Sequence, residues 1–162
     1  MTRVKIKGLR KVFGDLNKLF SPDVIFNVLS KSHETSIVKA VIGSAKNGIG
    51  PDNKIYTARK GDKINSRWLY SDNKSQHMLD KNRFSIAFQN GKIYLKWKAL
   101  NGEQAQYAAV HQGPERGGER NRLIPARPWL HFENEPNQEA LITAYEKTLA
   151  KLTSKFNSGE KI

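Results

Sequence analysis

Residues 84–97 read FSIAFQNGKIYLKW and predict a tight antiparallel β-hairpin. Segments rich in β-branched and aromatic residues flank Asn90-Gly91, a pair that tolerates the positive φ angles of a two-residue turn. That turn fixes the register and brings the large apolar side chains onto one face. The expected apolar pairs are Phe84 with Trp97, Ile86 with Leu95 and Phe88 with Ile93. The opposite face is more polar, so we expect helices to cover only one side of the sheet.

Apolar residues recur at helical spacing before and after the hairpin. One stripe runs from Leu9 to Phe20 and stops at Ser21-Pro22-Asp23. There a second helix is predicted to begin, because the serine can cap it and the proline has no N–H to leave unpaired. It is expected to end at Asn47-Gly48. A third stripe, from Leu141 to Phe156, predicts a C-terminal helix that opens at Asn134-Glu135-Pro136.

These elements predict one α+β domain, an antiparallel sheet with the N-terminal and C-terminal helices packed on one face. A length of 162 residues suits a single domain over 1–162. Alternating residues predict a short strand at 2–7, polar clusters predict long loops at 48–76 and 113–122, and 157–162 is expected to be a frayed tail. No apolar run approaches the roughly 20 residues needed to cross a bilayer, so we expect a soluble protein without membrane contact.

The chain is strongly basic in its first hundred residues. It holds 28 Lys and Arg against 15 Asp and Glu, a formal net charge of +13. The whole surplus precedes residue 101, because the remaining residues hold eight basic and eight acidic side chains. This asymmetry predicts a face that meets a polyanion, either nucleic acid or an acidic protein neighbour. Solubility alone is the competing explanation, since charged residues often simply face solvent.

The sequence offers little for catalysis. It has no cysteine, no Gly-x-Ser-x-Gly element and no phosphate-binding loop, and its histidines lack metal-ligand spacing. The histidines are His33, His77, His111 and His131. Pro51-Asp52 with Asp72-Asn73-Lys74 formally fits a nuclease pattern, but the second element has a loop composition. We therefore expect no enzyme, no metal and no cofactor, and a nuclease would require magnesium-dependent cleavage that Asp72→Ala abolishes.

Two elements between residues 107 and 130 resemble those of a known family. The first reads YAAVHQ at 107–112 and the second reads IPARPWL at 124–130, with a Gly/Arg/Glu stretch between them. They resemble the virion morphogenesis, or tail-completion, family of tailed phages, whose members typically carry Tyr-Ala-x-x-His-Gln, a Gly-rich stretch, Ile-Pro-Ala-Arg-Pro-Phe-Leu and a C-terminal helix. Here Trp129 takes the aromatic place, and Gly113 stands where an aromatic residue is common. The likeness covers most of the chain.

The resemblance implies a non-enzymatic assembly factor that completes the tail or joins it to the head connector. It implies a ring of identical subunits in contact with other tail or connector proteins, located in the tail or neck of the virion and assembled in the bacterial cytoplasm. The alternative is a basic nucleic-acid-binding module formed by residues 1–100, with Tyr94 among neighbouring lysines as a stacking platform. DNA contact is compatible with either function.

The second element has the chemistry of a stiff strut. Prolines on both sides of Ala126-Arg127 restrict the backbone, so Arg127 can be presented to a partner while Trp129 and Leu130 anchor into the sheet. The alternative is that this segment is only a strand leading into the C-terminal helix. The candidate partner contacts are Arg116, Arg120, Arg122, Pro125, Arg127, Pro128 and Trp129. The candidate structural residues of the motif are Tyr107, Ala108, His111, Gln112, Ile124, Ala126 and Leu130. We expect His111 and Gln112 at a strand end, bonded to the loop 113–122.

Overall fold

The computed structural model describes residues 9–56, 79–99, 102–113 and 128–159. The predicted strand at 2–7, nearly all of the loop 113–122 and the part of the loop 48–76 after residue 56 lie outside these residues. None of the described helices is long and apolar enough to span a bilayer.

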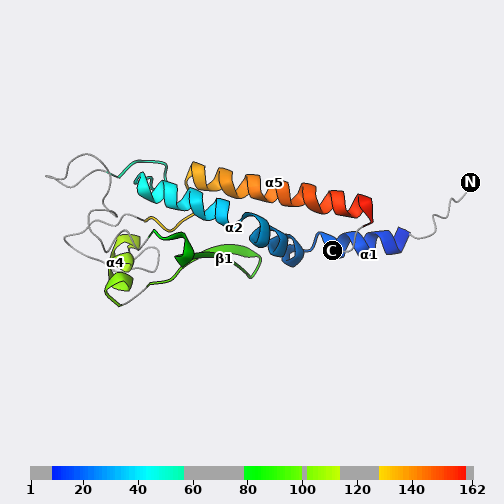
Figure 1. Ribbon diagram of the computed structural model, residues 1–162, viewed down its shortest axis with the longest axis horizontal. Coiled ribbons are helices and arrows are strands. Elements are labelled where there is room, and N and C mark those ends of the chain that lie inside the picture. The colour runs from blue at the N-terminus through cyan, green and yellow to red at the C-terminus, as the bar shows by residue number, and fades with distance from the viewer. Residues whose placement is uncertain (1–8, 57–78, 100–101, 114–127, 160–162) are drawn as a thin grey trace, which may run out of the picture.

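The described elements confirm the α+β class. In chain order they are α1 (Leu9–Leu19), α2 (Pro22–Lys46), the 3-10 helix η1 (Lys81–Arg83), β1 (Phe84–Gln89), β2 (Lys92–Trp97), α4 (Gly102–Gln112) and α5 (Glu135–Ser158). The long helices α2 and α5 lie side by side and run in opposite directions, and the hairpin packs against α2 through β1 (Figure 1). Helix α5 packs mainly along α2. Its residues Leu141 and Ala144 also pack with Ile86 of β1, so both long helices lie on one side of the hairpin, as predicted (Figure 1).

The hairpin has the predicted register. Phe84 pairs with Trp97 and Gln89 pairs with Lys92, with every pair between them in step. Asn90 and Gly91 both adopt positive φ, 51° and 73°, as a type I′ turn requires. The two-residue turn therefore sets which side chains face the helices.

The predicted boundaries of the long helices are correct except at the C-terminus. The Ser21 hydroxyl accepts the Val24 N–H at the start of α2 (3.4 Å), and the Asn134 side chain caps α5 in the same way. Helix α5, however, continues through Ser158 and stops at Gly159, where φ is 71°. The frayed tail predicted from residue 157 is thus corrected, because the helix ends where a glycine can take the left-handed conformation.

Helix α4 replaces the strand end that the sequence predicted around His111 and Gln112. Its residues are mostly good helix formers, Glu, Gln and Ala, and Glu103 lies in the first turn, where the helix dipole favours a negative charge. The helix ends at Gly113, where φ is 75°. The prediction was wrong because 11 residues with scattered apolar positions give no clear helical period.

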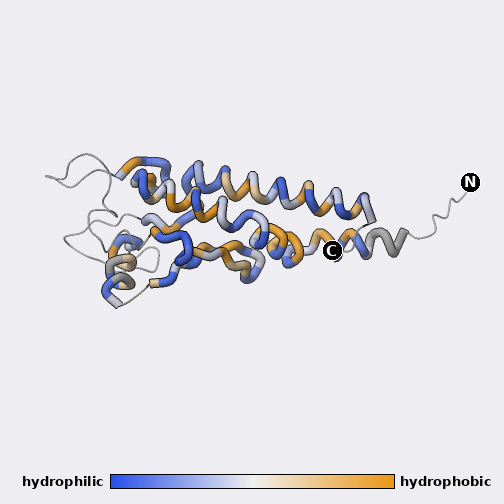
Figure 2. Tube along the Cα trace, viewed as in Figure 1, coloured by the Kyte–Doolittle hydropathy of each residue, from blue (hydrophilic) through white to orange (hydrophobic). Residues whose placement is uncertain are grey.

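The core lies between α2, the hairpin, α4 and the segment that leads into α5. One buried cluster contains Val38, Val41, Ala45, Leu79, Phe84, Ala108 and Trp129. A second contains Leu29, Ile37, Ile86 and Ala144. Along α5 the apolar residues alternate with polar ones from turn to turn, as expected for a helix with one buried face (Figure 2). Together the two clusters pack α2, α4 and α5 against the hairpin.

Candidate assembly surfaces

The strut ends at a junction that Tyr56 holds in place. The Tyr56 hydroxyl donates a hydrogen bond to the Pro128 carbonyl at 2.8 Å. Tyr56 follows a tight turn in which the Gly50 N–H donates to the Lys54 carbonyl, and a Cβ on Gly50 would lie 2.9 Å from the tyrosine oxygen. Only glycine at residue 50 lets the ring lie this close without displacement. This turn therefore positions the last residue of the strut.

Trp129 anchors the strut in the core. Its side chain is 1% exposed and makes edge-to-face contacts with Phe84 and Trp97, with ring centroids 6.0 and 5.4 Å apart. The Arg83 guanidinium lies 4.7 Å from the Trp97 ring centroid and donates through Nε to the Lys98 carbonyl. Burial lowers the pKa of Arg83 from its usual value. The predicted anchoring is confirmed, and the same burial removes Trp129 from the surface on which we had expected a partner contact.

A buried polar network connects the segment between Trp129 and α5 to both long helices. Asn137, in the first turn of α5, accepts from the Ser44 hydroxyl through Oδ1 (2.9 Å) and donates through Nδ2 to the His131 carbonyl (2.9 Å). Asn134 accepts the Asn137 N–H and donates to the Ile49 carbonyl at 3.4 Å. Since these groups are fully buried, each bond compensates the loss of water. The network fixes the start of α5 relative to the end of α2.

The polar positions of this network could have been found from the sequence. Asn137 precedes Leu141, Ala144 and Thr148 at helical spacing, so it lies on the buried face of α5. A polar side chain on such a face needs partners, and the capping position of Asn134 was already clear. The contacts with Ser44 and with the turn after α2 join segments about 90 residues apart, which spacing within one helix does not reveal.

The described residues of the two motif elements lie together in the core. Ala108 of α4 lies in the same buried cluster as Trp129, Leu130 packs against that cluster, and His111 is buried. The amide group of Gln112 is buried without a hydrogen-bond partner among the described residues. The Tyr107 side chain lies outside the described residues. So do seven further predicted site residues: Arg116, Arg120, Arg122, Ile124, Pro125, Ala126 and Arg127. The two motif elements therefore share one structural centre.

Removing the Tyr56 hydroxyl is expected to weaken the junction. Tyr56→Phe leaves the Pro128 carbonyl without this donor and should lower the free energy of unfolding by about 0.5–1.5 kcal/mol, measured by urea denaturation. Tyr145→Phe is the control, because Tyr145 is 43% exposed and its change should stay within about 0.5 kcal/mol. Equal stability of Tyr56→Phe and the wild type would show that the hydrogen bond does not hold the junction.

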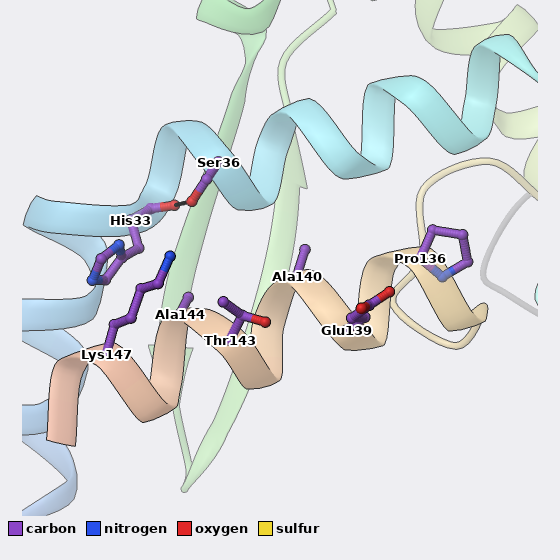
Figure 3. Close-up of a pocket in the computed structure, with 8 residues that line it drawn as sticks. All are labelled: His33, Ser36, Pro136, Glu139, Ala140, Thr143, Ala144 and Lys147. Atoms are coloured by element: carbon purple, nitrogen blue, oxygen red, sulfur yellow. Dashed lines mark hydrogen bonds between the residues drawn. The ribbon is translucent and has the colours of Figure 1, made fainter. Parts of the chain in front are cut away.

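An open groove of about 300 Å³ lies between α2 and α5. His33 and Ser36 contribute from α2, and Lys147 extends from α5 toward His33 (Figure 3). The remaining lining residues come from α5 and are Pro136, Glu139, Ala140, Thr143 and Ala144. Among the described residues no group of three or more histidines and acids could hold a metal ion.

The other flank of α5 is apolar and has acidic neighbours. Ile142 is 55% exposed and Tyr145 43% exposed, and their spacing of three residues places them on one flank. The exposed acids of this helix are Glu135, Glu139 and Glu146. This exposed apolar pair makes the flank a candidate contact surface.

The first half of the nuclease pattern lies on an exposed turn. The Asp52 carboxylate forms an ion pair with the Lys54 ammonium at 3.2 Å. Hydrogen bonds from Lys54 lower the pKa of Asp52. Asp72 and Lys74 lie outside the described residues, so the second half of the pattern stays a sequence hypothesis.

Residues 11–149 match the model of the phage virion morphogenesis family. Since the match covers most of the chain, the protein belongs to this family, as its sequence resemblance implied. No curated protein and no solved structure matches the chain. Family membership assigns the protein a role in building the phage virion.

Proposed function

We propose that the protein is a non-enzymatic structural subunit that completes the phage tail or joins it to the head connector, acting in a ring of identical copies. The observation that carries this proposal is the exposed apolar flank of α5, formed by Ile142 and Tyr145, on a subunit whose strut is anchored separately in the core. A head-to-tail ring requires two different surfaces on each subunit.

The arginine-rich segment, residues 114–127, is the second surface. Its sequence carries Arg116, Arg120, Arg122 and Arg127. Both of its ends are tied to the core, through α4 on one side and Trp129 on the other. Ala108 and Trp129, which stand on either side of the segment in the sequence, therefore hold fixed positions in the core of every subunit.

Charge complementarity relates the two surfaces. The exposed acids beside Ile142 and Tyr145 are opposite in charge to the arginines of the segment. Opposite charges on two different surfaces favour head-to-tail contacts and disfavour contacts between like surfaces. In the proposed ring, the arginine-rich segment of one copy lies against α5 of the next.

Substitution of the α5 flank tests the ring. Ile142→Asp should leave the monomer folded, because the side chain is largely exposed, and should shift the protein from rings to monomers by placing a charge in an apolar contact. Native mass spectrometry and negative-stain imaging measure the assembly, and circular dichroism checks the fold.

Ile55→Asp is the matched control, since Ile55 is 68% exposed in the turn before Tyr56 and lies outside the α5 flank. It should form rings like the wild type. If Ile142→Asp formed rings as stable as those of the wild type, this flank could not be the contact between subunits. A wild-type protein that stays monomeric at all concentrations would refute ring formation.

The polar face of the hairpin supports a second candidate function, binding of nucleic acid. Tyr94 is 43% exposed between Lys92 and Lys96. Duplex binding that is tight at low salt and falls steeply with ionic strength would support it, because counterions are released from the phosphates. Ring formation without duplex binding would contradict it.

A further inference from the structure

The outer edge of β2 has backbone groups that point away from β1. The Lys98 N–H donates to the Arg83 carbonyl at 2.9 Å, which makes this a hydrogen-bonded pair. Hydrogen-bonded and non-hydrogen-bonded pairs alternate along an antiparallel ladder. In the observed register, Ile93 and Leu95 belong to non-hydrogen-bonded pairs, and their N–H and C=O groups face outward.

The corresponding edge of β1 confirms this alternation and has a partner. Ile86, which is opposite Leu95, donates its N–H to Glu34 Oε1 of α2 at 2.9 Å. Within the part of the chain that the structure describes, no group bonds to the N–H of Ile93 or Leu95 in the same way. One edge of the sheet is therefore covered by α2, and the other is available for pairing.

The side chains of β2 divide the free edge into an apolar and a basic side. Ile93 and Leu95 are half-buried and pack against the second core cluster. Lys92, Tyr94 and Lys96 are exposed on the opposite face. From Lys81 to Lys98 the sequence contains five basic residues and no acidic one. A strand added at this edge would place alternate side chains beside the core and beside the lysines.

We propose that the outer edge of β2 pairs with an extended segment of another protein in which acidic and apolar residues alternate. The backbone groups of Ile93 and Leu95 supply hydrogen bonds, as in other cases of strand addition to a sheet edge. Acidic residues of the segment lie opposite Lys92 and Lys96, and its apolar residues extend the core beside Ile93. This inference deepens the proposed assembly function and rests on it, because it requires a protein neighbour.

The lysines of β2 disfavour a second copy of this protein as the strand that pairs with its outer edge. Pairing β2 with β2 of another subunit would place lysines opposite lysines, which destabilises a strand pair. The alternating segment 2–7 also carries only basic charges, at Arg3, Lys5 and Lys7. A nucleic acid would use the lysines but would leave the alternating N–H and C=O groups unpaired. An acidic protein strand satisfies both the charges and the backbone.

Residue-resolved hydrogen exchange tests the pairing. The probe is a ten-residue synthetic peptide in which glutamate and valine alternate, added to the full-length protein. At saturation, amide exchange of Ile93 and Leu95 should slow by about tenfold or more. Exchange of Tyr94 and Lys96 should change little, because their N–H groups already bond to β1. This alternating pattern is specific to strand addition.

Charge reversal supplies the matched controls. Lys92→Glu with Lys96→Glu should weaken peptide binding by about tenfold or more. Lys31→Glu with Lys39→Glu makes the same charge change at exposed positions on α2 and should leave binding nearly unchanged. A peptide with lysine in place of glutamate should not bind.

Three results would overturn the inference. They are no binding of the acidic peptide at millimolar concentration, binding without protection of Ile93 and Leu95, and binding of duplex DNA through the same lysines without that protection. In the first case the lysines would serve only to prevent edge pairing. None of these measurements requires rings, so failure here with intact rings contradicts the edge pairing alone, whereas loss of rings with normal peptide binding contradicts the proposed function.

Discussion

Trp129→Ala is expected to lower the free energy of unfolding by about 3–5 kcal/mol, the usual range for removing a buried aromatic side chain. Trp129 is almost fully buried, and its ring contacts both Phe84 and Trp97 across the hairpin. Alanine leaves a cavity at the point where the strut, α4 and the hairpin meet. Urea denaturation followed by circular dichroism measures the loss, which is large against the total stability of a small domain.

Trp129→Phe is the control that separates packing from the indole N–H. Within the described residues the Nε1 group has no hydrogen-bond partner, so its removal sacrifices no bond. We expect a loss of about 1 kcal/mol for the smaller ring, since one aromatic side chain replaces another. A phenylalanine variant as unstable as the alanine variant would contradict the view that an aromatic ring of either kind anchors the strut.

Asn137→Ala is expected to lower the free energy of unfolding by about 2–4 kcal/mol. The side chain accepts from Ser44 and donates to the His131 carbonyl, and both contacts are buried. Alanine removes both bonds and leaves their partners unsatisfied, at roughly 1–3 kcal/mol for each buried group. Because the network holds the start of α5, protease cleavage between Trp129 and Asn134 should also become faster in this variant.

A double-mutant cycle identifies the cause of that loss. Ser44→Ala alone should cost about 1–2 kcal/mol, because it leaves Asn137 Oδ1 without its donor. Ser44→Ala combined with Asn137→Ala should cost clearly less than the sum of the single changes, since residues that share a hydrogen bond are coupled. Strict additivity would show that the stability loss comes from altered packing and not from the hydrogen bond.

The strongest local signals in the sequence predicted their structures correctly. Asn90-Gly91 permits one turn type, and that turn fixes the register of the whole hairpin. Ser21 and Asn134 cap the helices that follow them, and Gly48 adopts positive φ after α2. In each case one or two residues restrict the nearby backbone, so no distant contact is needed.

The sequence by itself therefore determined the hairpin, the long helices and, through the motifs at 107–112 and 124–130, the family. Only the tertiary structure decided that 102–112 is a helix, that Trp129 is a buried anchor and not a partner contact, and that Asn137 joins segments far apart in the chain. It also showed that Glu34 of α2 accepts the Ile86 N–H at the edge of β1, while no described group bonds to the N–H of Ile93 or Leu95 on β2. The reason is physical: turns and caps depend on neighbouring residues, whereas burial, polar networks and free sheet edges depend on which distant segments pack together.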